Sequence, residues 1–140
     1  MEPTLTHTCH RLYFHLIWTT KNRELLISTD VEKALYPFLL QKTRELGAQL
    51  LALNGTDDHL HFLVKLPPKM APAKFVKDIK GSSSHFLSQK SGLNVVFKWQ
   101  AGYGIFSVGT KEIPFIRAYI QKQKEHHKSG KVIGEFETTE

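Results

Sequence analysis

Two histidines separated by one apolar residue, His59 and His61, begin the most strand-like segment of the chain. On a β-strand, residues i and i+2 point to the same face, roughly 7 Å apart along the chain, so both imidazoles can reach one metal ion. Tyr119 and Gln123 are four positions apart in a segment with helical periodicity, which makes them neighbours on one helix face. A metal ion held by neutral ligands beside a tyrosine hydroxyl could break a phosphodiester bond.

Each of these pairs also has an ordinary structural interpretation. A histidine pair in a strand can be half-buried without a metal, and Tyr119 and Gln123 can be a packing residue and a surface polar residue. Two polar rings without partners in so apolar a strand would be costly, which favours a metal site. In that interpretation Gln123 supplies a third ligand oxygen, Tyr119 is the nucleophile, and the ion is Mg²⁺ or Mn²⁺. Asp57 and Asp58 could orient an imidazole, or could simply form a turn.

Hydrophobic patterning predicts the elements that must position these residues. Strands are expected at residues 11–19, 49–54, 59–66, 95–99 and 103–108. Helices are expected after an N-cap at Thr29 up to Gly47, over residues 72–90, and from Lys111 or Pro114 to His127, where His126 and His127 suit the helix dipole. The order predicts an α+β, ferredoxin-like βαββαβ core with an antiparallel sheet, plus a C-terminal helix that carries the tyrosine and lies over the histidines.

Length and composition limit the classes of protein. We expect one domain over residues 1–130 and a poorly ordered tail over residues 131–140. The formal net charge of +6 favours a polyanionic partner, nucleic acid first. The single cysteine, Cys9, excludes an intramolecular disulfide and a cysteine-rich zinc site. With no stretch near the roughly 20 apolar residues of a membrane span and no secretory signal, we expect a cytoplasmic protein without a membrane partner.

Two regions offer contacts to nucleic acid. The second predicted helix carries Lys74, Lys77 and Lys80, which could bind phosphates or could be a solvated helix face. The segment from Trp99 to Phe106 sets aromatic residues around paired glycines. Trp99 and Tyr103 could stack on unpaired bases, or the segment could be a hairpin that packs its aromatic rings into the core.

Several segments match a known family in their order along the chain: Phe14 to Lys21, Asp58 to Val64, Pro67-Pro68, Lys80 to Ser83, Trp99 to Val108, and Tyr119 to Gln123. Together they resemble the single-tyrosine transposases of the HUH nuclease superfamily. These proteins are encoded by the smallest bacterial insertion sequences and include repeat-associated tyrosine transposases. The resemblance covers most of the chain, roughly Tyr13 to His127.

The resemblance implies a homodimer that cleaves and rejoins single-stranded DNA at hairpin ends of a mobile element. It implies that Tyr119 attacks a phosphate to give a 5′-phosphotyrosine, without a nucleotide cofactor, and that His59, His61 and Gln123 bind the metal. It also extends, loosely, DNA-contact roles to Arg11, Lys21, Arg23 and the helix of Lys74 to Lys80. Whether Tyr119 serves its own or a partner's metal site stays open.

Three alternatives remain at this point. A non-catalytic ferredoxin-like nucleic-acid-binding module explains the fold and charge, but not the combination of His59, His61, Tyr119 and Gln123. Replication initiators and relaxases of the same superfamily usually carry extra domains. A two-histidine phosphoesterase needs a second H-x-[ST] motif, which the chain lacks.

Overall fold

The computed structural model describes residues 8–130 and 133–139, which are built on a four-stranded antiparallel sheet. Its strands are β1 (Tyr13–Thr19), β2 (Gln49–Gly55), β3 (His59–Lys65) and β4 (Gly104–Val108), in the spatial order β2-β3-β1-β4. In the register of β1 and β3, Thr19 lies opposite His59 and Ile17 opposite His61. The histidine strand is therefore central, which agrees with its apolar composition.

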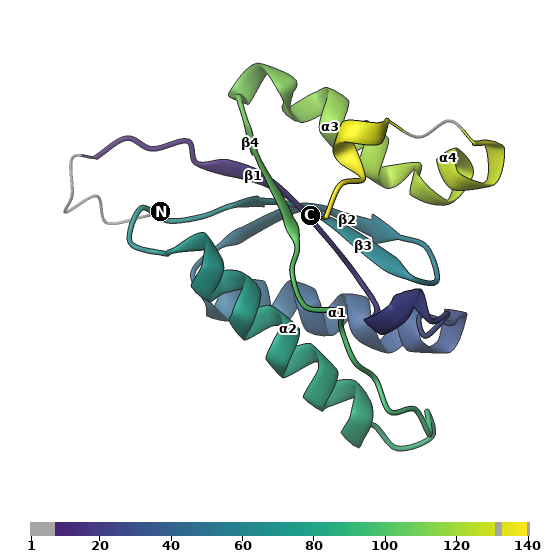
Figure 1. Cartoon of the computed structure of the whole chain (residues 1–140). Helices are drawn as coiled ribbons and strands as arrows, with labels where there is room; N and C mark the ends of the chain where they lie inside the picture. Colours follow the sequence, from purple (N-terminus) through teal and green to yellow (C-terminus); the bar gives the residue numbers. More distant parts are fainter. Residues whose placement is uncertain (1–7, 131–132, 140) are drawn as a thin grey trace.

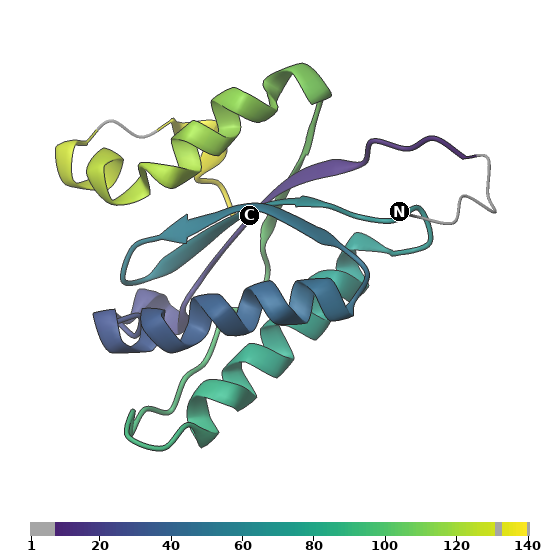
Figure 2. The same cartoon turned by 180° about the vertical axis from the view of Figure 1, so that it is seen from behind.

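The helices form a layer on each side of this sheet. Helices α1 (Thr29–Glu45) and α2 (Pro72–Gln89) cover one face, and α3 (Ile113–Gln121) and α4 (Gln123–Ser129) lie over the other (Figures 1 and 2). The larger core, with Trp18, Phe62 and Phe75, packs under α1 and α2, while Leu63 and Ile120 belong to a smaller core with α3. The predicted ferredoxin-like α+β fold with an added C-terminal helix is confirmed.

Only one of the two ends of α1 agrees with the prediction from the sequence. The N-cap is Ser28, whose hydroxyl accepts a hydrogen bond of 3.2 Å from the Val31 N–H, so the predicted cap at Thr29 is wrong by one residue. Both residues carry the hydroxyl a cap needs, and Ser28 is the one with extended backbone. Gly47 follows the helix with φ of 82°, the left-handed conformation expected of a C-terminal glycine.

The strand predicted over residues 95–99 is wrong. Only an isolated bridge joins Trp99 to Thr20, and the rest of the segment pairs with no strand. Phe97 is 2% exposed and its N–H bonds to the Ser88 hydroxyl at 3.2 Å. The apolar pattern that suggested a strand therefore reflects packing of a loop against the larger core.

The last predicted helix is divided in two at Lys122, which lies at φ −104° and ψ 22°. No proline or glycine stands at the break. Instead, the Asn54 side chain in β2 donates a hydrogen bond of 3.0 Å to the carbonyl of Gln121, an acceptor that a continuous helix would use internally. Helix α4 continues two residues past the predicted end at His127, since it stops at Ser129, and Gly130 follows with φ of 76°.

Short 3-10 turns complete the chain: η1 (Lys21–Arg23), η2 (Thr110–Glu112) and η3 (Gly134–Phe136). The described part of the tail, expected to be poorly ordered, follows η3 across the sheet face beside α3 (Figure 1). Its backbone at Thr138 passes so close to Gly104 that any side chain at that position would collide with it. The boundary drawn at residue 130 stays a prediction. No described helix has the length and apolar character needed to cross a membrane.

Candidate active site

His59 opens the sheet side of the site as the first residue of β3, and it is 1% exposed. Its Nδ1 lies 2.9 Å from Asp58 Oδ1 and 2.9 Å from the Thr56 hydroxyl. Arg23 Nη1 lies 3.3 Å from the other oxygen of Asp58. Burial would raise the pKa of Asp58, but the hydrogen bond to His59 and the charge of Arg23 outweigh it and lower the pKa. An imidazole oriented at Nδ1 presents Nε2 to the site, which favours Asp58 as the orienting residue.

His61 is fully buried, and its two ring nitrogens have different partners. Nδ1 lies 2.8 Å from Nε2 of His15 in β1, and Nε2 lies 3.1 Å from Oε1 of Glu137. Burial lowers the pKa of His61, although the Glu137 carboxylate acts in the opposite direction. Burial, and then His61, lower the pKa of His15 to about 3. Both rings are therefore neutral at pH 7, the form in which an imidazole can bind a metal.

Tyr119 and Gln123 face the histidines from the other side. Ile116 and Ile120 pack into the smaller core with Leu63, which seats α3 on the sheet. Gln123 is fully buried with its Oε1 3.2 Å from His59 Nε2, and the rings of Tyr119 and His61 lie 6.0 Å apart. The structure thus brings together all four residues singled out from the sequence, although the helix that was expected to carry them is broken between them.

Helix α4 is fastened to the rest of the domain by Lys124. Its Nζ donates to Glu32 Oε2 at 2.7 Å, to Asn54 Oδ1 at 2.8 Å and to the Gly55 carbonyl at 3.1 Å. This contact places His127 with its ring 4.5 Å from that of His59. The sequence favoured a helix-capping role for His127, and the structure instead places it at the histidine cluster.

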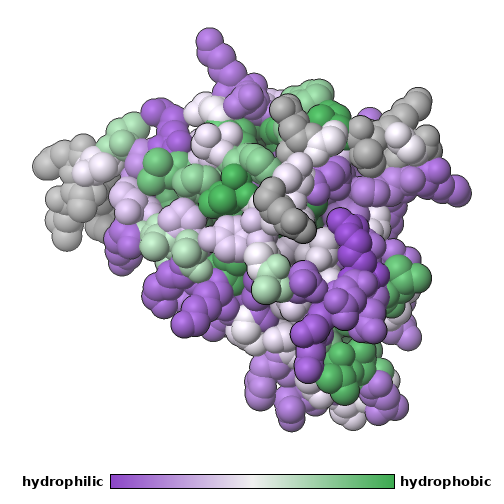
Figure 3. All heavy atoms as spheres, viewed as in Figure 1, coloured by the Kyte–Doolittle hydropathy of each residue, from purple (hydrophilic) through white to green (hydrophobic). Residues whose placement is uncertain are grey.

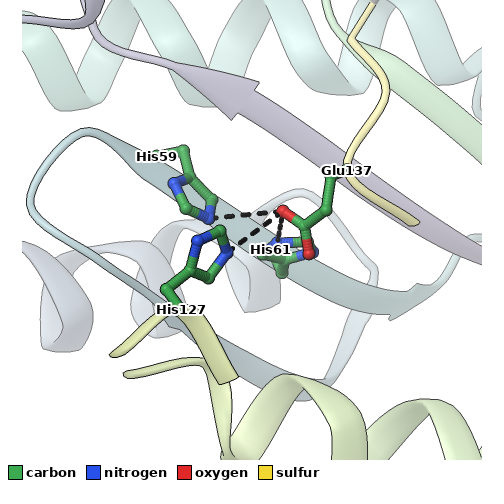
Figure 4. Close-up of side chains that lie close together, drawn as sticks. All are labelled: His59, His61, His127 and Glu137. Carbon is green, nitrogen blue, oxygen red and sulfur yellow. Dashed lines mark hydrogen bonds and ion pairs between the residues drawn. The ribbon is translucent and has the colours of Figure 1, made fainter. Parts of the chain in front are cut away.

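Glu137, from the tail, lies at the centre of the cluster (Figure 4). Its Oε1 is 3.1 Å from His61 Nε2, 3.3 Å from His127 Nε2 and 3.6 Å from His59 Nε2, and its Oε2 accepts a hydrogen bond from the Tyr119 hydroxyl. Burial would raise its pKa, but the hydrogen bond from His61 and the other partners lower it to about 2. The carboxylate is therefore ionised at neutral pH. It contacts residues of β3, α3 and α4.

The donor atoms fit a divalent metal ion. One atom from each of His59, His61, His127 and Glu137 lies within 4.8 Å of all the others, and Gln123 Oε1 lies beside His59. Imidazole nitrogens combined with amide and carboxylate oxygens suit ions such as Mn²⁺. The predicted ligand set is therefore part of a group that could hold a metal, to which the structure adds two donors.

Tyr119 is held in its protonated form. Burial, and then the hydrogen bond to Glu137, raise the pKa of Tyr119 to about 12. The Ile133 N–H, which donates to the hydroxyl oxygen at 3.1 Å, acts in the opposite direction, as does Gln123. Attack by the phenol therefore requires either a proton acceptor or the removal of the negative charge of Glu137 from the hydroxyl.

The predicted basic residues separate into two groups. Lys21 and Lys80 line a groove of about 380 Å³ together with Lys98, and Arg23 lines a neighbouring groove of about 440 Å³ that reaches Thr139. These grooves share Gln100 and Ala101 and lie at the end of β1 nearest His59.

The remaining basic residues lie elsewhere. Lys74 pairs with Asp78 at 3.0 Å, Lys77 is exposed on α2, and Arg11 precedes β1 at its other end. Lys80 also holds the loop after Trp99, since its ammonium donates to the carbonyls of Gln100 at 2.7 Å and Gly102 at 2.9 Å. Figure 3, which shows the face seen in Figure 1, has hydrophilic side chains around several hydrophobic patches.

The aromatic residues of the same loop favour the packing alternative. The Trp99 indole N–H donates to the Ser83 hydroxyl at 2.9 Å, and its ring lies 4.6 Å from that of Phe97. Tyr103 is half-buried against the larger core. The contacts of Trp99 are those of a packed ring, whereas base stacking by Tyr103 stays a prediction.

Sequence reasoning missed His15 and Glu137. A signal for His15 exists, because it is a polar residue in an apolar strand. It lies two positions from Ile17, the partner of His61, and therefore points to the same face of the sheet. Glu137 stands in a short acidic segment without periodicity, and nothing local distinguishes it from the other tail glutamates.

Comparison with known proteins agrees with this geometry. Residues 8–123 match the family described as "Transposase IS200 like". The transposase for insertion sequence element IS200 of Salmonella typhimurium is 29% identical over 138 residues, which cover 94% of this chain and 90% of that protein. The ISDra2 transposase TnpA of Deinococcus radiodurans is 28% identical over 119 residues, covering 81% of this chain and 85% of that one.

Two solved structures share the fold. A Deinococcus radiodurans R1 protein described as a transposase matches with a TM-score of 0.65 and 28% identity, over 88% of this chain and 98% of its own. The repeat-associated (REP) tyrosine transposase bound to a REP hairpin matches with a TM-score of 0.64 and 18% identity, over 94% of this chain and 76% of its own.

The family match over residues 8–123 therefore defines a transposase. The chain belongs to the IS200-like transposase family, whose members are enzymes of DNA cleavage and strand transfer.

Proposed function

We propose that this protein cleaves and rejoins single-stranded DNA through a 5′-phosphotyrosine on Tyr119. His59, His61 and Gln123 hold the divalent metal in this proposal. The observation that carries it is the convergence of these four residues: Gln123 Oε1 lies 3.2 Å from His59 Nε2, and the Tyr119 and His61 rings lie 6.0 Å apart. Residues from the central strand and from the C-terminal helices meet although they are more than fifty positions apart.

The chemical step uses the phenol of Tyr119. Its oxygen forms a bond to phosphorus, the bond from phosphorus to the 3′ oxygen breaks, and the phenol proton leaves while the 3′ oxygen gains one. The bond energy is kept in the phosphotyrosine, so a later 3′ hydroxyl can reverse the step without a nucleotide cofactor. When bound, Mg²⁺ or Mn²⁺ supplies Lewis-acid polarisation of the scissile phosphate.

The protein residues orient this step. Asp58 and Thr56 fix the ring of His59 through contacts of 2.9 Å, and Gln123, the first residue of α4, lies with its Oε1 3.2 Å from His59 Nε2. Glu137 lies in the space between the imidazoles that a substrate phosphate oxygen needs. The described arrangement therefore requires the carboxylate to move when DNA enters.

Two grooves lined by basic residues support a path for the DNA strand toward the site. The two grooves lined by Lys21, Lys80 and Arg23 meet at Gln100 and end at Thr139, beside the histidine end of the sheet. Recognition of a hairpin is supported by the relative that is bound to a REP hairpin. The homodimer rests on the family resemblance alone, and the position of Tyr119 over the histidines of its own chain supports attack in cis.

The experiment that tests the proposal is covalent trapping. The full chain is incubated with Mn²⁺ and hairpin-bearing single-stranded oligonucleotides, and the products are resolved on a denaturing gel. A protein–DNA band that disappears in EDTA and in Tyr119→Phe is expected, because the phenylalanine ring fills the same space but has no nucleophile. Tyr13→Phe is the control, since it removes a half-buried phenol at the end of β1 away from His59. An adduct formed by Tyr119→Phe would refute the assignment, and binding without any adduct would favour a non-catalytic DNA-binding module.

A further inference from the structure

His15, in β1, contacts His61, one of the two histidines proposed to bind the metal. It is 1% exposed and lies on the site face of the sheet, diagonally across from His61, because Ile17 is the direct partner of His61. The two imidazoles are stacked with ring centroids 5.0 Å apart and an interplanar angle of 29°, and His15 Nε2 is 2.8 Å from His61 Nδ1. A buried polar ring in this place needs a physical reason.

We infer that His15 is a positioning residue for His61: it holds the ring through Nδ1 so that Nε2 faces the metal. This inference rests on the proposed metal role of His61. An imidazole that binds a metal through Nε2 carries its proton on Nδ1 and needs an acceptor there. His15 Nε2 is the atom in hydrogen-bonding distance of that nitrogen.

The two ligand histidines are held by chemically different partners. His59 Nδ1 contacts a carboxylate, Asp58, and a hydroxyl, Thr56. His61 Nδ1 contacts a neutral imidazole instead. A carboxylate can only accept a hydrogen bond, whereas a neutral imidazole accepts with one tautomer and donates with the other.

This difference matters because the other nitrogen of His61 changes partner. In the described structure His61 Nε2 is 3.1 Å from the Glu137 carboxylate, so Nε2 carries the proton and Nδ1 accepts a hydrogen bond from His15 Nε2. When Nε2 binds a metal, the direction of the bond between the rings reverses. Each ring keeps one proton, which moves from Nε2 to Nδ1, so no net proton is released. His15 can follow the change without moving.

The surroundings of His15 agree with a neutral ring that serves one neighbour. The rings of Phe106 and Phe136 lie 6.2 Å and 5.4 Å away, and among the described residues its Nδ1 has no hydrogen-bond partner. A histidine selected for packing alone gains nothing over leucine at such a place. Leucine would fill the volume and would leave no buried nitrogen unpaired.

The test measures metal affinity rather than DNA cleavage. The dissociation constant for Mn²⁺ is determined by electron paramagnetic resonance on the full chain, and thermal unfolding is recorded for each variant. His15→Leu is expected to weaken Mn²⁺ binding by about ten- to a hundred-fold, the range for residues that orient a ligand histidine, with an unchanged or higher Tm. His15→Gln keeps an oxygen near the Nε2 position and is expected to restore most of the affinity.

Ile17→Val is the matched control, because Ile17 is buried on the same strand and face as His15. It is expected to lower the Tm slightly and to leave Mn²⁺ binding unchanged. Should His15→Leu bind Mn²⁺ as tightly as the unchanged chain, the positioning role is refuted while the proposed function stands. Should the unchanged chain bind no Mn²⁺, both fail.

A second measurement needs no substitution and so does not depend on a variant that folds. Imidazole ¹⁵N chemical shifts of the unchanged chain report the tautomer of His61 with and without Mg²⁺. We expect the proton on Nε2 without the ion and on Nδ1 with it. A His61 that keeps its proton on Nε2 in saturating Mg²⁺ overturns the inference.

Discussion

His59 and His61 come from one strand in the middle of the sheet, whereas Tyr119, Gln123, His127 and Glu137 come from three consecutive segments at the C-terminal end of the chain. The two histidines are held at Nδ1 by residues from β1 and from the loop before β3. The residues that face them are carried by α3, by α4 after the break at Lys122, and by the tail.

The difference shows how rigidity is divided within the site. Hydrogen bonds on both edges of β3 fix the backbone of the histidines, so their side chains can be oriented by single contacts. The C-terminal side is assembled from separate elements, α3, α4 and the tail, and α4 is positioned by the contacts of Lys124. Apart from the nucleophile Tyr119, we therefore expect substitutions on the sheet side to remove metal-dependent chemistry, and substitutions on the C-terminal side to modulate it.

Among the proposed metal ligands, the largest effect is expected for His61→Ala. It removes a ligand fixed at both ring nitrogens, and the rate of adduct formation at saturating Mn²⁺ should fall by more than about a hundredfold. Gln123→Ala should cost about tenfold, because His127 Nε2 lies within reach of the same donors. Single-turnover gels measure both rates, with Gln121→Ala as the exposed control. If Gln123→Ala lowered the rate as much as His61→Ala or more, the sheet side would not be the more rigid side of the site.

Glu137→Gln should increase the rate of adduct formation, whereas the two ligand substitutions lower it. The carboxylate raises the pKa of Tyr119 and occupies the space of a substrate phosphate, so a neutral amide should speed adduct formation by up to about tenfold at neutral pH. The rate should also reach its plateau at lower pH, which a pH–rate profile measures. Glu125→Gln makes the same chemical change at an exposed position on α4. A slower reaction in Glu137→Gln would mean that the carboxylate is a required ligand.

The same carboxylate predicts a pH dependence of stability. Its pKa falls from 4.5 to about 2 in the folded protein, so its contribution is complete above about pH 4.5 and is lost as the pH falls toward 2. At neutral pH we expect it to be on the order of 1–3 kcal/mol. Urea unfolding of the unchanged chain and of Glu137→Gln, measured from pH 7 to pH 2, should show a difference that disappears on acidification. A difference independent of pH would contradict this account.

The smallest effect is expected for Lys124→Met. The lysine side chain is 55% exposed, so its ion pair with Glu32 should contribute less than about 1 kcal/mol to stability. Because it positions α4, adduct formation should still fall a few-fold, more than in the control Lys128→Met on the same helix. If both variants behaved alike, Lys124 would not position the C-terminal side.

The sequence determined those features that depend on local spacing. The alternation of side chains along a strand puts His59 and His61 on one face, and helical spacing makes Tyr119 and Gln123 neighbours. Apolar patterning was sufficient for four strands, two long helices and the ferredoxin-like order. These periodicities are properties of short segments, and tertiary packing only strengthens them.

Tertiary structure alone decided the break at Lys122, the unpaired loop at residues 95–99, and the places of His15, His127 and Glu137 in the site. Each depends on a contact between distant segments, such as Asn54 with the Gln121 carbonyl or His15 with His61. The free energy of such a contact comes from two surfaces that meet only after folding. Apart from His15, a polar residue in an apolar strand, the residue types of one segment therefore carry no record of such a contact.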